Sequence, residues 1–338
     1  NDYVGRIGIG RVSRGTIKIG DQVSVLKLDG SAKNFRVTKI FGFIGLDRVE
    51  IQEAKAGDLI AVSGMEDIYV GETVTPVDHQ EALPILRIDE PTLQMTFAAN
   101  DSPFVGREGD FVTGRKIEER LRHQLHTDVS LRVEDTDKAG AWIVSGRGEL
   151  HLSILVEEMR REGFELQLSR PEVIYRDIDG VTCEPFEMVQ IDTPDQYTGS
   201  VIDSMAQRKG EMQNMESDAN NQTRMTFLAP SRGLIGYSTE FLTMTGGYGI
   251  MNHTFEKYMP VIKNWEPGRR NGALVSINAG SSTTYSLQSV EDRGQLFIGA
   301  GVDVYEGMIV GQNSRDTDIA VNVTKGKNLT NTRASGKD

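Results

Sequence analysis

Residues 145–166, SGRGELHLSILVEEMRREGFEL, predict a tight turn, an amphipathic helix and the start of a strand. Two glycines allow the chain to turn abruptly after a strand that ends at Val144. In the helix, which begins near Glu149, apolar residues recur at spacings of three and four, as on a buried helix face. They are Leu152, Leu155, Val156 and Met159. Gly163 ends the helix before an alternating strand, so the stretch is half of a split βαβ unit.

The same order of elements returns later in the chain. It comprises a strand over 224–228, the turn Pro230-Ser231-Arg232-Gly233, a helix over 234–244, two glycines and a strand over 250–255. Two copies of one small α+β unit are therefore predicted to follow each other in the sequence.

The composition is that of an ordinary globular protein. Of 338 residues, 38% are hydrophobic and 25% are charged. No apolar run approaches the roughly 18 residues of a membrane span, and the first residues have no signal-peptide pattern, so we expect a cytoplasmic protein. The single cysteine, Cys183, allows no internal disulfide and is interpreted as a small buried hydrophobe.

The charge is distributed unevenly along the chain. The formal net charge is −12, which argues against indiscriminate binding to nucleic acid. Residues 324–338 are the only basic segment, with four Lys or Arg against one Asp. An acidic body with one basic tip suits a protein that contacts a polyanion at chosen points. The alternative is a solvated tail whose charge is incidental.

Residues 3–78 show short alternating apolar stretches separated by glycine turns, with no helical pattern. This pattern predicts a small closed β-barrel. The string GRIGIGRVSRGTIKIGDQV, residues 5–23, resembles the second domain of translational GTPases, the barrel shared by elongation factors Tu and G. The resemblance implies docking on a GTPase domain and contact with the small ribosomal subunit.

Residues 82–170 read as strand, helix, strand, strand, helix, strand, which predicts a ferredoxin-like sandwich. The loop and first helix, NDSPFVGREGDFVTGRKIEERL, and the later SGRGELHLSILVEEMRREGFEL resemble the third domain of the TypA/BipA family of ribosome-associated GTPases. Asp101 and Gly114 depart from the usual family pattern, and Gly114 is expected to weaken the cap of the first helix by a few tenths of a kcal/mol.

Residues 171–262 form the second predicted sandwich. The strings RKGEMQNM and PSRGLIGYSTEFLTMTGGYGIMNHTF resemble the fifth domain of the same family. Elongation factor G inserts a further domain between its two sandwiches, whereas this chain passes directly from Arg170 to Tyr175. LepA also lacks that insertion but has different motifs here, so a LepA-like fragment is the runner-up within the class.

Residues 263–338, with RRNGALVSINAG, SVEDRGQLFIGAGVDVYEGMIVG and KGKNLTNTRASG, resemble the domain that distinguishes TypA/BipA from its relatives. We expect it to be mainly β and truncated. The predicted domains are 1–80 (barrel), 81–170 and 171–262 (ferredoxin-like), and 263–338 (family-specific).

The resemblance implies the non-GTPase part of a TypA/BipA-type factor. The missing GTPase domain would carry GTP and Mg²⁺, and no G-x-x-x-x-G-K-[ST] loop occurs in this chain, so the fragment is predicted to hold no cofactor and not to be an enzyme. The implied partners are the 70S ribosome, with its rRNA, A-site tRNA and ribosomal proteins, and the protein's own GTPase domain. We expect a monomer that does not bind membranes and acts in translation, ribosome assembly or stress response.

The candidate ribosome- and RNA-binding residues lie in the closing loop, 324–336, which is rich in Lys, Gly, Asn and Thr. Carried over from the family, they are Lys325, Lys327, Asn328 and Arg333. Arg147 and Arg232, in the two glycine turns, are candidate anion or RNA contacts. For the Arg147 turn a plain tight turn is favoured, because the same pattern recurs in both predicted sandwiches. His123 and His126 have no evident third partner for a metal ion, so a solvated helix face is favoured.

Two functions from other classes remain open. Paired ferredoxin-like domains also form metabolite-sensing modules. A free-standing RNA-recognition module is disfavoured because EGFELQLS, on the relevant strand, lacks the paired aromatic residues that stack bases.

Overall fold

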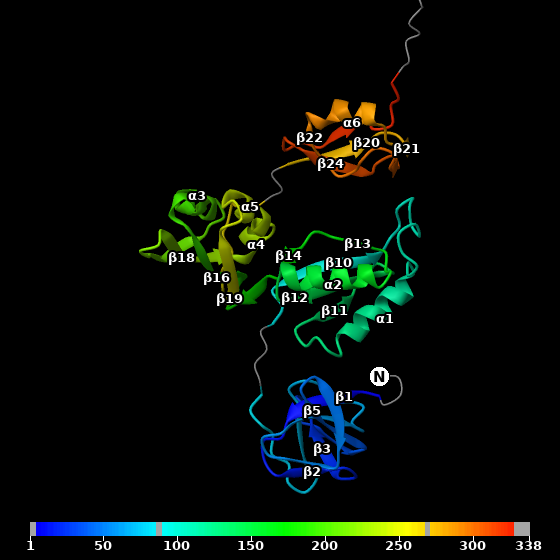
Figure 1. Cartoon of the computed structure of the whole chain (residues 1–338), viewed down its shortest axis with the longest axis vertical. Helices are drawn as coiled ribbons and strands as arrows, with labels where there is room; N and C mark the ends of the chain where they lie inside the picture. The colour runs from blue at the N-terminus through cyan, green and yellow to red at the C-terminus, as the bar shows by residue number, and fades with distance from the viewer. Residues whose placement is uncertain (1–4, 86–89, 268–270, 328–338) are drawn as a thin grey trace, which may run out of the picture. The chain divides into compact units, whose positions relative to one another are not determined.

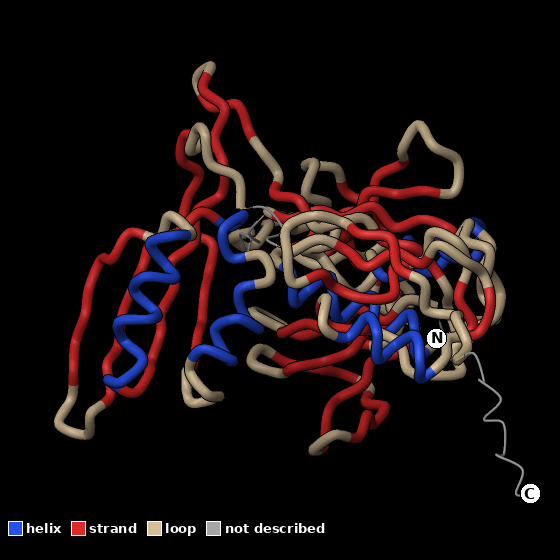
Figure 2. The backbone as a smooth tube through the Cα atoms, turned by 90° about the horizontal axis from the view of Figure 1, so that it is seen from above, coloured by secondary structure: helices blue, strands red, loops and turns tan. Residues whose placement is uncertain are grey.

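The computed structural model describes residues 5–85, 90–267 and 271–327. The chain is mostly β, as the red segments of the backbone trace show (Figure 2). It forms two compact units, residues 1–99 with 111–170 and residues 100–110 with 171–338. Among the described residues, no helix is both long and apolar enough to cross a membrane.

The first unit opens with nine short strands. They are β1 (Ile7–Arg11), β2 (Thr16–Lys18), β3 (Gln22–Leu26), β4 (Ala32–Arg36), β5 (Lys39–Ile44), β6 (Asp47–Ile51), β7 (Glu53–Lys55), β8 (Leu59–Ser63) and β9 (Thr73–Pro76). Their hydrogen bonds define three sheets, in the orders β1-β8-β5-β6, β4-β3-β9 and β2-β7. The closed barrel predicted from the sequence is therefore not confirmed. One reason is that β2 and β7, three residues each, pair only with each other.

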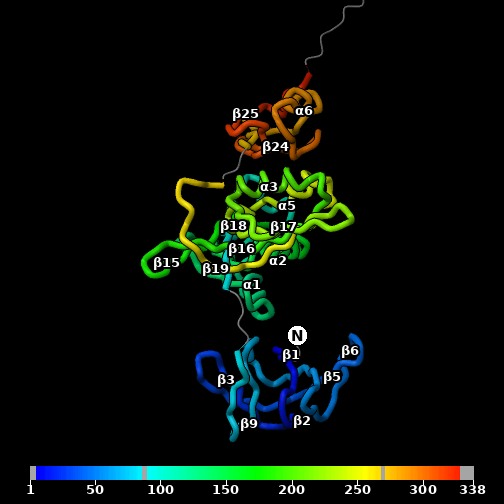
Figure 3. Tube along the Cα trace, turned by 90° about the vertical axis from the view of Figure 1, so that its left-hand side faces the viewer, coloured from blue at the N-terminus to red at the C-terminus, as the bar shows by residue number. Residues whose placement is uncertain are grey.

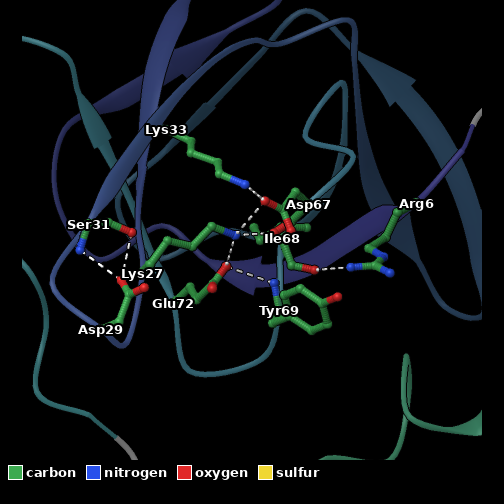
Figure 4. A network of polar contacts seen from close by, with 9 residues as sticks. All are labelled: Arg6, Lys27, Asp29, Ser31, Lys33, Asp67, Ile68, Tyr69 and Glu72. Carbon is green, nitrogen blue, oxygen red and sulfur yellow. Dashed lines mark hydrogen bonds and ion pairs between the residues drawn. The ribbon is translucent and has the colours of Figure 1, made fainter. Parts of the chain in front are cut away.

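A single apolar core nevertheless joins the three sheets. Val25 and Ile40 are fully buried in it, and Ala54 of the small sheet packs with them. Charged groups join the segment after β8 to Lys27, just past β3, and to Lys33 in β4 (Figure 4). The Lys27 ammonium lies 3.0 Å from the carboxylate of Glu72, and both side chains are nearly buried. Lys33 donates to Asp67, which is the main reason that the pKa of Asp67 lies below its ordinary value.

The rest of the first unit alternates strands and helices. The elements are β10 (Leu93–Ala99), α1 (Gly114–Gln124), β11 (Arg132–Asp135), β12 (Ala141–Gly146), α2 (Glu149–Arg161) and β13 (Leu166–Leu168). The strands form an antiparallel sheet in the order β11-β12-β10-β13. The two helices α1 and α2 run alongside this sheet (Figure 1).

Helix α2 follows the apolar spacing of the sequence closely. Leu152, Leu155 and Met159 are buried, as predicted, whereas Val156 is half-buried. The helix ends where Gly163 adopts a left-handed conformation, φ 93°, which glycine reaches without strain. At the other end, a Cβ on Gly146 would lie 2.9 Å from side-chain atoms of His151 and Leu152, so the turn before α2 needs a glycine.

The second unit contains a sheet with the same strand order. The elements of residues 171–260 are β14 (Glu172–Val173), β15 (Arg176–Ile178), β16 (Val181–Pro194), the 3₁₀ turn η1 (Asp195–Tyr197), α3 (Thr198–Gln207), β17 (Glu211–Ser217), β18 (Gln222–Pro230), α4 (Ser231–Leu234), α5 (Tyr237–Met244) and β19 (Ile250–Pro260). Strands β17, β18, β16 and β19 are adjacent in that order. Helices α3 and α5 cover one face of the sheet (Figure 3), where Val201, Met205 and Phe241 pack with Val189 and Phe227.

The predicted continuous helix over 234–244 is broken in the structure. Helix α4 ends at Leu234, and Gly236 takes a left-handed φ of 73° before α5 begins at Tyr237. This break redirects the chain so that both Leu234 and Tyr237 reach the same core.

The last part of the second unit is a small sheet with one helix. Its elements are β20 (Ala273–Ser276), β21 (Gly280–Ser281), α6 (Thr284–Glu291), β22 (Gly294–Leu296), β23 (Asp303–Val304), β24 (Ile309–Asn313) and β25 (Ile319–Val321). The main sheet has the order β22-β24-β20-β25, and β25 runs parallel to β20. Its core includes the fully buried Leu274, Val310 and Val323.

Candidate nucleic-acid interface

The closing loop starts from a fixed base beside helix α6. After β25, the carbonyl of Val323 accepts hydrogen bonds from the backbone N–H of Thr283 (3.0 Å) and from the hydroxyl of Ser286. The Thr283 hydroxyl also donates to the carbonyl of Lys325 (2.6 Å) and accepts from the Ser286 N–H (3.2 Å), capping the helix. The backbone up to Lys325 is thereby anchored on the first turn of α6.

The two described lysines of the loop are available to a ligand. Lys325 and Lys327 are exposed, and in the part of the chain that the structure describes their ammonium groups have no carboxylate partner. The first turn of α6 adds a partial positive charge, because its backbone N–H groups point toward this end of the helix. The arrangement therefore suits phosphate oxygens. Asn328 and Arg333 lie outside the described residues.

The sequence-based prediction missed the residues that hold the loop. It contained no helix at 284–291, although threonine at position 283 is a common N-cap residue. The loop sequence could not indicate that Thr283 and Ser286 hold the loop, because both residues lie about 40 positions before it.

Arg147 lies in a turn that is closed by a histidine. Its backbone N–H donates to His151 Nδ1 (3.1 Å), and His151 Nε2 lies 2.5 Å from a carboxylate oxygen of Asp128. Burial alone would raise the pKa of Asp128, but hydrogen bonds from His151 and Ser130 outweigh it and the pKa is lowered. The Arg147 amide is thus already used, and only its exposed side chain is free for an anion.

Arg232 does not have the free guanidinium that the sequence suggested. Its side chain is only 10% exposed, and it forms an ion pair with Glu184, which is fully buried. In this conformation the guanidinium faces a buried carboxylate inside the unit and is not presented to RNA. The two glycine turns therefore differ in the placement of their arginine side chains: Arg147 is exposed to solvent, whereas Arg232 is buried.

The two histidines lie near each other at the C-terminal end of α1. His123 lies in α1, whereas His126 lies beyond its end, and the ring centroids are 5.5 Å apart. Both residues are exposed, and the slight desolvation of the His126 ring is the main reason that its pKa lies below the ordinary value. No group of three His, Cys, Asp or Glu suited to a metal ion occurs among the described residues.

Four family models match the chain in succession. They are Elongation factor Tu domain 2 at residues 5–75, Elongation Factor G, domain III at 112–170, Elongation factor G C-terminus at 181–266, and TypA/BipA C-terminal domain at 271–338. Three of these modules are parts of elongation factors, so the chain is of the translation-factor class.

The relatives that match all 338 residues include three from different bacteria. Each carries the name Large ribosomal subunit assembly factor BipA, and they come from Bacillus subtilis (strain 168) (67% identical), Synechocystis sp. (49%) and Escherichia coli (strain K12) (48%). Together with the C-terminal model, they place the chain in the TypA/BipA family, to which it belongs. The alignments cover 100% of this chain and 55–56% of the relatives, so the chain spans about half their length.

A solved structure from Thermus thermophilus is also similar. It has a TM-score of 0.48 and 18% identity, covering 77% of this chain and 54% of the other. This likeness is too loose to support any argument about function.

Proposed function

We propose that this chain is the ribosome-binding portion of a TypA/BipA-type translational GTPase that acts on the 70S ribosome in translation, ribosome assembly or stress response. The observation that carries the proposal is the 67% identity, over all 338 residues, to a protein named as a large ribosomal subunit assembly factor. The full-length protein would bind GTP and Mg²⁺ in a GTPase domain outside these 338 residues, and this part would not hydrolyse GTP.

The proposed architecture has four parts with the limits 1–80, 81–170, 171–262 and 263–338. The strand order that the two central sheets share supports a ferredoxin-like assignment for both. Residues 1–80 are proposed as the translation-factor module that contacts the small subunit and the GTPase domain. The work of these parts is binding, and the protein is proposed to be a cytoplasmic, ribosome-associated monomer.

The RNA contact is proposed to lie in the closing loop. Lys325 and Lys327 would pair with phosphates of rRNA or of the A-site tRNA, and Arg333 and Asn328 would extend the contact. The support is the anchored base: because Thr283 and Ser286 hold the backbone, these lysines lose less conformational entropy on binding than they would on a free tail.

The test is sedimentation of the chain with 70S ribosomes, and with separated subunits, over a series of salt concentrations. The triple variant K325E/K327E/R333E is expected to bind more weakly. The plot of log affinity against log salt concentration should become shallower, its slope shrinking in magnitude by about 2 to 3, because three phosphate contacts are lost.

The matched control changes the same number of charges elsewhere. Three exposed residues serve for this: Arg132 in β11, Lys257 in β19 and Lys209 in the turn before β17. The variant K209E/K257E/R132E should leave the salt slope unchanged. If the loop variant keeps the parent's affinity and salt slope, the RNA contact does not lie in the closing loop. Absence of sedimentation at every salt concentration would overturn the proposed function itself.

Neither alternative function is favoured by a specific observation. A metabolite-sensing module would need an enclosed pocket. Among the described residues, a depression beside the end of α1 is wide and open, and it is lined by Glu118, Glu119, Arg122, His123 and His126. The whole-chain relatives carry the BipA name rather than that of LepA.

A further inference from the structure

Arg232 and Glu184 form a buried ion pair inside the second unit. The Arg232 Nε–H donates to both carboxylate oxygens of Glu184, at 2.9 and 3.0 Å, and a terminal nitrogen lies 2.9 Å from Oε2. Glu184 is completely shielded from solvent. A carboxylate in such a place is tolerated only if it is paired and hydrogen-bonded, so Arg232 is required by Glu184.

Both members of the pair also bind one short segment that follows β19. The terminal nitrogens of Arg232 donate to the carbonyls of Ile262 (2.7 Å) and Trp265 (2.5 Å). The Ile262 N–H donates back to Glu184 Oε2 (3.2 Å). The guanidinium carbon lies 4.7 Å from the centre of a Trp265 ring, in the range of a cation–π contact.

The glycine that follows Arg232 makes room for the same tryptophan. A Cβ on Gly233 would lie 3.0 Å from the Trp265 ring and 2.6 Å from the carbonyl oxygen of Arg208. Arg208 in turn donates to the Gly233 carbonyl at 2.6 Å. The Arg232-Gly233 pair thus serves one purpose: the arginine binds the segment's backbone, and the glycine lets the tryptophan ring approach.

The bound segment has no regular structure of its own. Strand β19 ends at Pro260, and Asn264 adopts a left-handed φ of 57°, which is uncommon outside glycine. Beyond the β19 ladder, the segment is held by a backbone bond from Val261 to Thr182 (3.1 Å) and by the bonds to Arg232 and Glu184.

We propose that Arg232 and Glu184 act together as a latch, meaning that their hydrogen bonds hold residues 262–265 against the second sheet. Trp265 is then the last residue that is fixed on this sheet. Arg232 is then a positioning residue: it fixes where the connection to the last domain begins, and it is not an anion-binding residue. The latch is independent of what the protein binds, because all its partners lie within this chain.

The test uses Arg232→Lys in the whole chain. Lysine retains the charge opposite Glu184 but has no planar fork to reach two carbonyls at once. Tryptic cleavage after the exposed Lys263 reports opening of the segment, since cleavage of a transiently opened site follows its population. The loss of one charge-assisted hydrogen bond should raise the cleavage rate about tenfold or more.

Tryptophan fluorescence supplies a second readout. The chain has two tryptophans, so in a W142F background acrylamide quenching reports Trp265 alone. Quenching should increase in Arg232→Lys, while the circular-dichroism melting curve changes little. Arg224→Lys is the matched control, because Arg224 is an exposed arginine paired with Asp192 on the same sheet, and it should alter neither readout.

Two further variants keep the proposal testable if Arg232→Lys unfolds the sheet. Glu184→Gln preserves shape but removes the charge, and Trp265→Leu leaves the ion pair intact while removing the stacked ring. Faster cleavage after Lys263 in either folded variant supports the latch. Wild-type cleavage and quenching in Arg232→Lys, or wild-type cleavage in both other variants, would overturn it.

Discussion

The apolar face of α2 gives a quantitative prediction for Leu155. This side chain is 2% exposed, whereas Leu150 on the same helix is 73% exposed. Leu155→Ala removes buried methyl groups and leaves a cavity, which typically costs about 2 to 5 kcal/mol; we expect about 3 kcal/mol in the free energy of unfolding. Leu150→Ala makes the same chemical change on the surface and should stay within about 0.5 kcal/mol of the parent.

The measurement is urea unfolding followed by the fluorescence of Trp142. This residue is buried in β12 of the sheet that α2 covers, and a W265F background removes the other tryptophan. The free energy of unfolding is read from the midpoint and the slope of the transition. Equal stabilities for Leu155→Ala and Leu150→Ala would refute the assignment of the buried face. A larger loss for Leu150→Ala would mean that α2 is rotated about its axis.

Three further predictions concern other parts of the chain. Gly163→Ala should destabilise the first unit by about 1–2 kcal/mol, because alanine at a φ of 93° is strained; an unchanged urea midpoint would contradict this. The pKa of Asp128 is lowered in the folded chain, so its ionised form stabilises the fold above the ordinary value of 3.8, and this contribution is lost as the pH falls through the lower folded value. Asp128→Asn should therefore flatten the acid limb of stability measured against pH, and a limb as steep as that of the parent would count against the His151 contact. A fluorescent GTP analogue should show no saturable binding to the chain, as measured by anisotropy; stoichiometric binding would place a nucleotide site within these residues.

Much of the helical structure could be predicted from local spacing. The buried face of α2, at Leu152, Leu155 and Met159, follows from apolar residues three and four apart. These predictions succeed because a helix brings together residues that are near each other in sequence. The family motifs were equally visible, because they are also continuous stretches.

Features that depend on contacts between residues far apart in the sequence could be seen only in the tertiary structure. Arg232 reads as a candidate anion contact until Glu184, 48 positions away, and Trp265, 33 positions away, are placed around it. The base of the closing loop likewise depends on Thr283, which lies 42 positions from Lys325. The strands of residues 7–76 were visible as alternation, but their division into three sheets depends on which edges meet. Spacing along the chain reveals periodicity, whereas contacts between distant residues form only in the folded core. That is why the partners of Arg232 could be identified only from the structure.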